Sequence, residues 1–135
     1  MNLRPVDQTT FGWWRPPYQP GNCLSACLAT ILDLSIDDVP NFIDLSDTND
    51  SQWRDRLNAW LAAMGLRAHH ISFAPCPTEA LAGFAPSSPF VLFGRSKKNF
   101  EHAVVAAGPR VVHDPHPSRS GLATAHGMII IEPDC

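Results

Sequence analysis

The chain has 135 residues, of which 44% are hydrophobic and 17% charged. This composition excludes a disordered chain, and the length predicts one domain spanning residues 1–135. The formal net charge is -3, so no basic excess indicates a nucleic acid or an anionic membrane as partner. The 13 prolines are about twice the average usage and predict short elements joined by fixed turns.

Four cysteines are too few for a disulfide scaffold in a chain of this length. The N-terminal residues lack the apolar segment of a signal peptide, and no apolar run has the length of a membrane span. We therefore expect a cytoplasmic protein whose thiols are reduced.

Residues 1–20 form an arm rich in proline and aromatic residues, which we expect to be extended. Its tryptophans, Trp13 and Trp14, either pack the arm onto the core or line a substrate groove. We include Trp14 among the candidate substrate-binding residues.

A first helix is predicted to begin at Cys23 and to end near Leu34, with Asn22 as its N-cap. Residues 35–40 read as a short capped turn that Pro40 ends. A second helix is capped by Ser51 at its start and followed by Gly65, and its apolar face consists of Trp53, Leu57, Trp60, Leu61 and Met64.

Strand-like runs dominate the rest of the chain, at residues 66–73, 90–93, 102–106, 110–113 and 128–131, with a short helix at residues 78–84. Gly108-Pro109 predicts a tight hairpin between two of these runs. Because helices come first and strands follow, we predict an α+β fold in which N-terminal helices pack on a C-terminal antiparallel sheet.

Cys23 lies where the free N–H groups and the dipole of a helix favour a thiolate, the reactive form of cysteine. His102 and Asp114 flank the predicted hairpin almost symmetrically, so their side chains are expected to meet. A cysteine, a histidine and an orienting carboxylate are the parts of a nucleophilic site. Gln19 lies just upstream and is a candidate amide donor to an oxyanion.

Two blocks of the sequence, residues 19–32 and residues 102–105 with 112–115, resemble the papain-like cysteine peptidases. Within that superfamily they are most similar to the domain that removes double-glycine leaders from bacteriocins. The resemblance implies a papain-like fold, with Cys23 as nucleophile, His102 as general base and acid, and Asp114 as the residue that orients His102. It also implies Gln19 as the oxyanion donor.

One departure from the family pattern is Leu24, which stands where the family has glycine and is expected to narrow the substrate cleft. His116 follows Asp114 closely and is a candidate residue of the cleft rim. A zinc site is an alternative, formed by Cys23 and Cys27 with His113 and His116. However, the cysteine pairs of structural zinc sites usually have a different spacing. We expect no metal and no cofactor.

The predicted activity is hydrolysis of a peptide or isopeptide bond through a thioester intermediate, with a peptide or protein as the partner. An amidase, a deamidase or an acyltransferase needs the same site, and a binding module can keep the fold without the chemistry. The sequence leaves these alternatives open.

Overall fold

The computed structural model describes residues 3–11, 21–44 and 46–134 of the chain. The helical elements in these ranges are α1 (Cys23–Leu32), η1 (Ile36–Asp38), α2 (Asp50–Ala62) and η2 (Thr78–Leu81). The strands are β1 (Leu66–Cys76), β2 (Phe90–Arg95), β3 (Glu101–Ala107), β4 (Arg110–His113) and β5 (Thr124–Pro133). The predicted α+β class is therefore confirmed.

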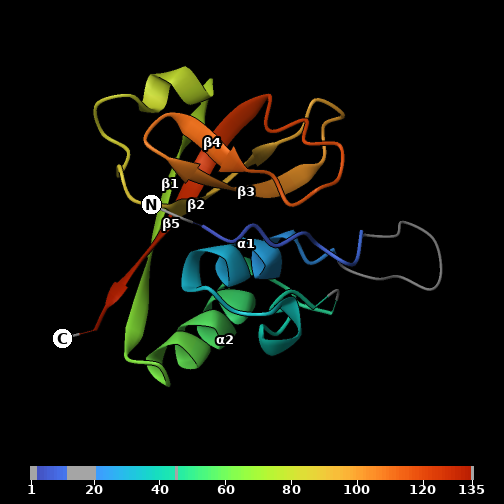
Figure 1. Cartoon of the computed structure of the whole chain (residues 1–135), viewed down its shortest axis with the longest axis vertical. Helices are drawn as coiled ribbons and strands as arrows, with labels where there is room; N and C mark the ends of the chain where they lie inside the picture. Colours follow the sequence, from blue (N-terminus) through green and yellow to red (C-terminus); the bar gives the residue numbers. More distant parts are fainter. Residues whose placement is uncertain (1–2, 12–20, 45, 135) are drawn as a thin grey trace.

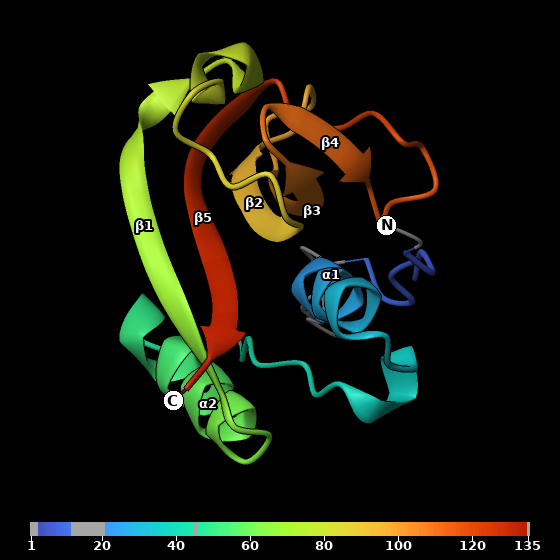
Figure 2. The same cartoon turned by 60° about the vertical axis from the view of Figure 1, so that its left-hand side comes forward.

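The strands form one antiparallel sheet in the order β1-β5-β2-β3-β4. In Figure 1 β2, β3 and β4 lie in the upper half of the molecule, above α1 and α2, and β1 and β5 extend downward beside the helices. Figure 2 shows β1 and β5 as a long curved pair that reaches from the upper strands down to α2. The helices that come first in the chain thus pack against a sheet built from its second half, as predicted.

The main core lies between α1 and one face of the sheet, because α1 is buried on nearly all sides and contributes Leu24, Cys27 and Leu28. A second core lies on the opposite face of the sheet, where Leu81 of η2 covers Phe90 and Leu92. These two cores hold the sheet between layers and fix the strand ends that carry the polar residues considered below.

The helix ends differ in detail from the predictions. Helix α1 stops at Leu32, because Asp33 adopts a left-handed conformation with φ of 59°. The N-cap of α2 is Asn49 rather than Ser51, and it forms a capping box with Gln52. Met64 lies beyond the end of α2 and is 42% exposed, so its predicted place on the buried face is wrong.

The hairpin between β3 and β4 turns at Gly108, whose φ of 59° suits glycine, as the Gly-Pro pair predicts. The pairing of β3 with β4 shifts its register between Val105 and Ala106.

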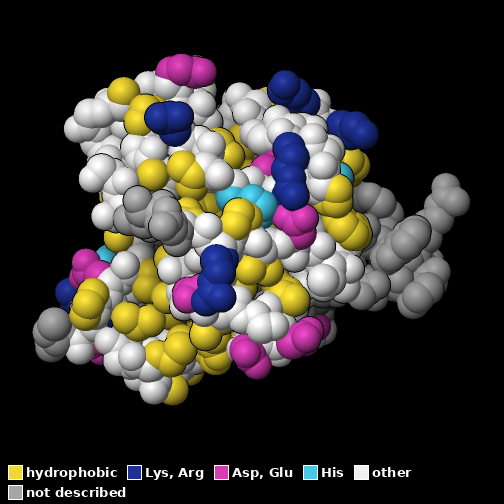
Figure 3. All heavy atoms as spheres, in the orientation of Figure 1, with side chains coloured by type: hydrophobic (Ala, Val, Ile, Leu, Met, Phe, Trp, Pro, Cys, Tyr) yellow, Lys and Arg dark blue, Asp and Glu magenta, His cyan; other side chains and the backbone are white. Residues whose placement is uncertain are grey.

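Strand β4 is an edge of the sheet, and hydrophobic side chains show on the surface in its vicinity as well as over the helices (Figure 3). No helix in the described parts of the chain is long and apolar enough to cross a bilayer.

Candidate active site

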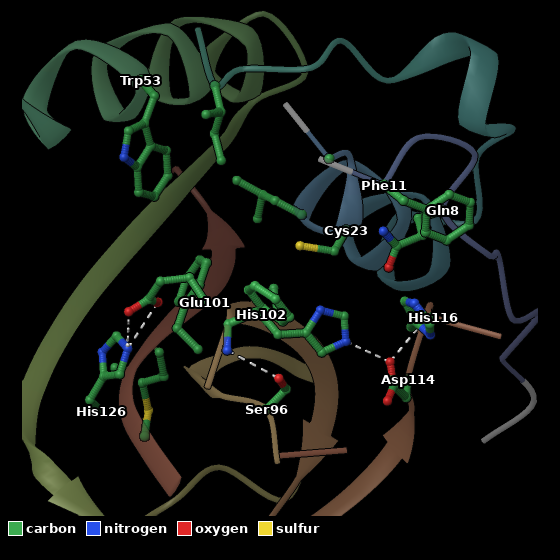
Figure 4. Close-up of a pocket in the computed structure, with 18 of the residues that line it drawn as sticks. Gln8, Phe11, Cys23, Trp53, Ser96, Glu101, His102, Asp114, His116 and His126 are labelled. Atoms are coloured by element: carbon green, nitrogen blue, oxygen red, sulfur yellow. Dashed lines mark hydrogen bonds and ion pairs between the residues drawn. The ribbon is translucent and has the colours of Figure 1, made fainter. Parts of the chain in front are cut away.

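Cys23 is the first residue of α1, and its half-buried side chain lines a large cleft. At this position the first-turn N–H groups have no partner within the helix, so they favour a negative charge on a side chain beside them. In Figure 4 the Cys23 sulfur points into the cleft, toward the ring of His102. The predicted place of Cys23 at a helix start is confirmed.

His102 lies near the start of β3, and Asp114 directly follows β4 on the other side of the hairpin. The His102 Nε2 atom is 2.7 Å from Asp114 Oδ1, so the predicted meeting of these side chains is confirmed. Because Nε2 bonds to Asp114, the other ring nitrogen, Nδ1, lies on the side of Cys23 (Figure 4). The three residues are thus arranged in series, although they come from three separate elements.

Hydrogen bonds within this series shift the pKa values of His102 and Asp114. Burial lowers the pKa of His102, but hydrogen bonds with Asp114 and Cys23 outweigh it and raise that pKa to about 9. Burial raises the pKa of Asp114, yet the hydrogen bonds that it accepts from His102, the His116 N–H and the Gly121 N–H bring it to about 2. At neutral pH the arrangement therefore favours an imidazolium between a carboxylate and the cysteine.

Gln8, which the sequence analysis did not single out, also lines this cleft. Its side chain is directed toward Cys23 in Figure 4, and the residue is only 8% exposed. The Gln8 backbone N–H donates to the Pro115 carbonyl at 3.1 Å, and one side-chain N–H donates to the Thr10 carbonyl at 3.0 Å. The amide carries a second N–H, and its Oε1 atom is buried without a hydrogen-bond partner among the described residues.

Asn22 holds the segment that carries Gln8. The Asn22 Oδ1 atom accepts from the backbone N–H of Thr9 at 2.9 Å and of Thr10 at 3.0 Å, and Nδ2 donates to the Thr9 hydroxyl at 2.8 Å. Its side chain makes no capping hydrogen bond to α1, which corrects the predicted capping role. The residue before the nucleophile therefore ties the N-terminal segment to the start of the helix.

A second set of contacts joins the same segment to the loop that carries Asp114. Arg119 forms a bidentate ion pair with Asp7 and also donates to the Asp114 carbonyl. His113 donates from Nε2 to the Val6 carbonyl at 2.9 Å. Residues 6–10 are thus held from two sides, between the start of α1 and the end of β4.

The structure places the other candidate site residues in different surroundings. His116 lines the cleft, and its ring centroid lies 5.4 Å from that of Phe11 and 6.2 Å from that of His102. Leu24 also borders the cleft, but it is 2% exposed and packs in the main core, so little of it is accessible to a substrate. Trp14 and Gln19 lie outside the described residues.

The zinc alternative does not fit the geometry. Cys27 is fully buried in the main core, and burial raises the pKa of its thiol well above the usual range. His113 and His116 are engaged with Val6 and Ser118. Over residues 3–11, 21–44 and 46–134, no three histidine, cysteine or acidic side chains converge as a metal site requires.

Gln8 escaped the sequence analysis because it lies 15 positions before Cys23, far from where a short motif places an oxyanion donor. Asn22 was the one residue whose type could have pointed to this contact, because an asparagine beside a helix start can also form hydrogen bonds with the backbone of another segment.

Comparison of the chain with known proteins found no matching family model, no matching curated protein and no matching solved structure.

Proposed function

We propose that this protein is a papain-like cysteine hydrolase that cleaves a peptide or isopeptide bond. The observation that carries the proposal is the series Cys23, His102 and Asp114, in which the 2.7 Å bond to Asp114 leaves Nδ1 of His102 for the thiol. Such a series, with a nucleophile, a base and a group that orients the base, is what nucleophilic catalysis requires.

In the proposed reaction the Cys23 thiolate attacks the substrate carbonyl carbon, and the carbonyl oxygen becomes an oxyanion. The Cys23 backbone N–H and the free side-chain N–H of Gln8 donate to this oxygen. The imidazolium of His102 gives its proton to the leaving amine as the C–N bond breaks, which leaves a thioester on Cys23. His102, now neutral, takes a proton from water, and the resulting hydroxide adds to the thioester carbon. The C–S bond then breaks, which releases the acid and regenerates the Cys23 thiolate beside the His102 imidazolium.

The size of the cleft supports a chain substrate rather than a small amide. Its volume is about 1300 Å³, larger than the roughly 300–1,000 Å³ of sites for small molecules. It extends from Gln8 and Phe11 at one end to Trp53 at the other (Figure 4), and His70 lies beside the Trp53 ring. We therefore favour a peptide or protein over a small amide as the substrate.

A screen of quenched fluorescent peptides tests the proposal, with release of ammonia from glutamine peptides measured in parallel. We expect peptide cleavage by the wild type and none by Cys23→Ala. Ammonia release without cleavage contradicts peptide hydrolysis and identifies a deamidase. If neither occurs, and Cys23 forms no thioester with any peptide, the hydrolase assignment is wrong.

We also propose that the protein acts in the cytoplasm, where reducing conditions keep a catalytic thiol available. Fractionation of cells that express a tagged chain tests this location. Co-purification with cytoplasmic marker enzymes is expected, and recovery in a secreted or membrane fraction contradicts it.

A further inference from the structure

An ion pair between Asp7 and Arg119 lies close to the residues that the proposed reaction uses. The Arg119 Nη1 atom donates to Asp7 Oδ1 at 2.5 Å, and Nη2 donates to Asp7 Oδ2 at 2.8 Å. This bidentate geometry fixes the direction of the contact as well as its length. Asp7 directly precedes Gln8 in the chain, and Arg119 also donates to the backbone carbonyl of Asp114. The guanidinium therefore connects the segment of Gln8 to the loop of Asp114.

Arg119 adopts a backbone conformation that favours glycine over arginine. Its φ is 53°, in the left-handed region, and its N–H donates to the His116 carbonyl at 3.0 Å, which closes the turn. Glycine forms such a turn without strain, so the backbone gives no reason for an arginine at this position. Residues held in strained conformations cluster at functional sites. The contacts of its side chain are therefore the reason that we consider for Arg119.

Stability alone is a poor explanation of this ion pair. The side chains of Arg119 and Asp7 are 49% and 45% exposed. Exposed ion pairs stabilise a fold little, because solvent screens the charges and two long side chains lose conformational freedom. The hydrogen bond with Arg119 lowers the pKa of Asp7, so both groups are charged at neutral pH. The pair is thus better suited to fixing two segments relative to each other than to stabilising the fold.

The Gln8 amide has few hydrogen bonds that set its own position. One side-chain N–H donates to the Thr10 carbonyl at 3.0 Å, which belongs to the same segment. The Oε1 atom is buried and unpaired in the part of the chain that the structure describes. The place of this amide beside Cys23 is therefore set by the backbone around it. Because Asp7 is the next residue, the contact that holds Asp7 also decides where Gln8 lies.

The carboxylate of Asp114 is held by groups other than Arg119. Its oxygens accept three hydrogen bonds, from His102 Nε2 at 2.7 Å, the His116 N–H at 2.9 Å and the Gly121 N–H at 2.7 Å. Arg119 donates instead to the backbone carbonyl of Asp114. Loss of the guanidinium is therefore expected to displace Gln8 relative to Cys23 and to leave the carboxylate with its partners.

We infer that Asp7 and Arg119 are positioning residues, whose ion pair holds the Gln8 amide where it donates to the oxyanion. In this role neither residue touches the substrate, and both act through Gln8. The inference rests on the proposed function, because an oxyanion forms only if Cys23 attacks a carbonyl. It assigns the ion pair to the rate of bond cleavage and not to substrate binding.

The change Arg119→Gly tests the inference, because glycine suits the backbone conformation and removes the guanidinium. The values of kcat and KM are measured on a quenched fluorescent peptide that the wild type cleaves. We expect kcat to fall by about tenfold to 100-fold, since a displacement of about 1 Å can cost that much, and KM to change little. Alkylation of Cys23 by iodoacetamide forms no oxyanion, so its rate and pH dependence are expected to stay those of the wild type.

Asp33→Gly is the matched control. Asp33 forms the same kind of bidentate ion pair with Arg4, at 2.6 Å for both hydrogen bonds, and its φ of 59° is also left-handed. This pair also joins the N-terminal segment to another element, but it lies at the end of α1, and neither residue borders the cleft. We expect an unchanged kcat. A loss equal to that of Arg119→Gly contradicts a specific role for the pair of Asp7 and Arg119.

A double variant identifies the residue through which the pair acts. When Gln8→Ala has already removed the amide, Arg119→Gly is expected to reduce kcat no further, because both changes remove the same oxyanion contact. Losses that multiply overturn the inference. An altered pH dependence of Cys23 alkylation in Arg119→Gly also overturns it, since the guanidinium then acts through Asp114 and His102.

Asp7→Asn removes the same ion pair from its other side and is expected to repeat the loss of kcat. This variant decides the inference if Arg119→Gly does not fold. A wild-type kcat in the folded variants overturns the inference and leaves the proposed function standing. Absence of peptide cleavage by the wild type overturns both.

Discussion

The two ends of the cleft are built in different ways. At the catalytic end, hydrogen bonds at 2.7 Å and 2.9 Å fix Asp114 to His102 and to the His116 N–H. At the opposite end of the cleft, which we call the aromatic end, the rings of Trp53 and Phe93 contact each other, with centroids 6.1 Å apart. Directed hydrogen bonds suit a site where atoms must meet at set distances, whereas ring surfaces suit a site that accepts a range of side chains.

The two ends also differ in how they depend on the rest of the fold. The catalytic end draws on α1, β3, the loop after β4 and residues 6–10, which ion pairs and backbone hydrogen bonds tie together. The aromatic end draws on α2, β1 and β2. We therefore expect changes at the catalytic end to alter the rate of bond cleavage.

The largest expected effect follows from the change Asp114→Asn. An amide keeps the shape of the side chain but loses the negative charge that stabilises the His102 imidazolium. Turnover is expected to fall by about 100- to 10,000-fold. Peptide cleavage rates measure the loss, with Asp37→Asn as a control on η1 outside the cleft. Equal losses in both variants contradict a specific role for Asp114.

A somewhat smaller effect is expected for Gln8→Ala. Loss of one oxyanion donor reduces turnover by about 100- to 1,000-fold, whereas alkylation of Cys23, which forms no oxyanion, remains at the wild-type rate. Gln19→Ala is the matched comparison, because the sequence resemblance assigns this role to Gln19. Normal turnover in Gln8→Ala together with reduced turnover in Gln19→Ala would show that Gln19, and not Gln8, is the oxyanion donor.

The change Asn22→Ala tests how the N-terminal segment is held. It removes three hydrogen bonds to Thr9 and Thr10, so the free energy of unfolding is expected to fall by about 2 kcal/mol. Urea denaturation measures the change, with Asn58→Ala at an exposed position of α2 as the control. A loss no greater than that of the control shows that the segment does not depend on Asn22.

The smallest effect is the pH dependence of stability. Because the folded pKa of His102 is raised from 6.5 to about 9, its contribution to the free energy of unfolding is complete below pH 6.5 and is lost as the pH rises toward 9. Because the folded pKa of Asp114 is lowered from 3.8 to about 2, its contribution is present above pH 3.8 and is lost as the pH falls toward 2.

Thermal unfolding across this range is expected to show its highest midpoints between pH 3.8 and 6.5, with a decline on both sides. Asp114→Asn is expected to flatten both declines, since the charge pair is absent. A wild-type midpoint that rises between pH 6.5 and 9, or identical profiles for the two proteins, contradicts the coupling of His102 with Asp114.

The sequence was most informative where one local element decides the geometry. The Gly108-Pro109 turn brings His102 and Asp114 together, because the pairing of a hairpin is set within a few residues of its turn. Gln8 could not be predicted in this way. Its place beside Cys23 depends on contacts with Asn22 and the loop after β4, which join segments far apart in the chain.

The aromatic end illustrates another limit of pattern analysis. The helical spacing of Trp53 with Leu57 and Leu61 predicts a shared buried face, and both leucines are indeed fully buried. Trp53 lies one turn nearer the helix start, where the core ends and the cleft begins, so its ring is only partly covered. Periodicity shows which side of a helix faces inward, but not where along that side the core ends.

The central claim is that Cys23 and His102 form a reactive pair, and limiting iodoacetamide with intact-mass detection tests it most directly. We predict selective alkylation of Cys23 well below pH 8, while buried Cys27 stays unmodified, and loss of that selectivity in His102→Ala. Cysteines that all react equally slowly, or a His102→Ala variant that reacts like the wild type, would contradict the claim.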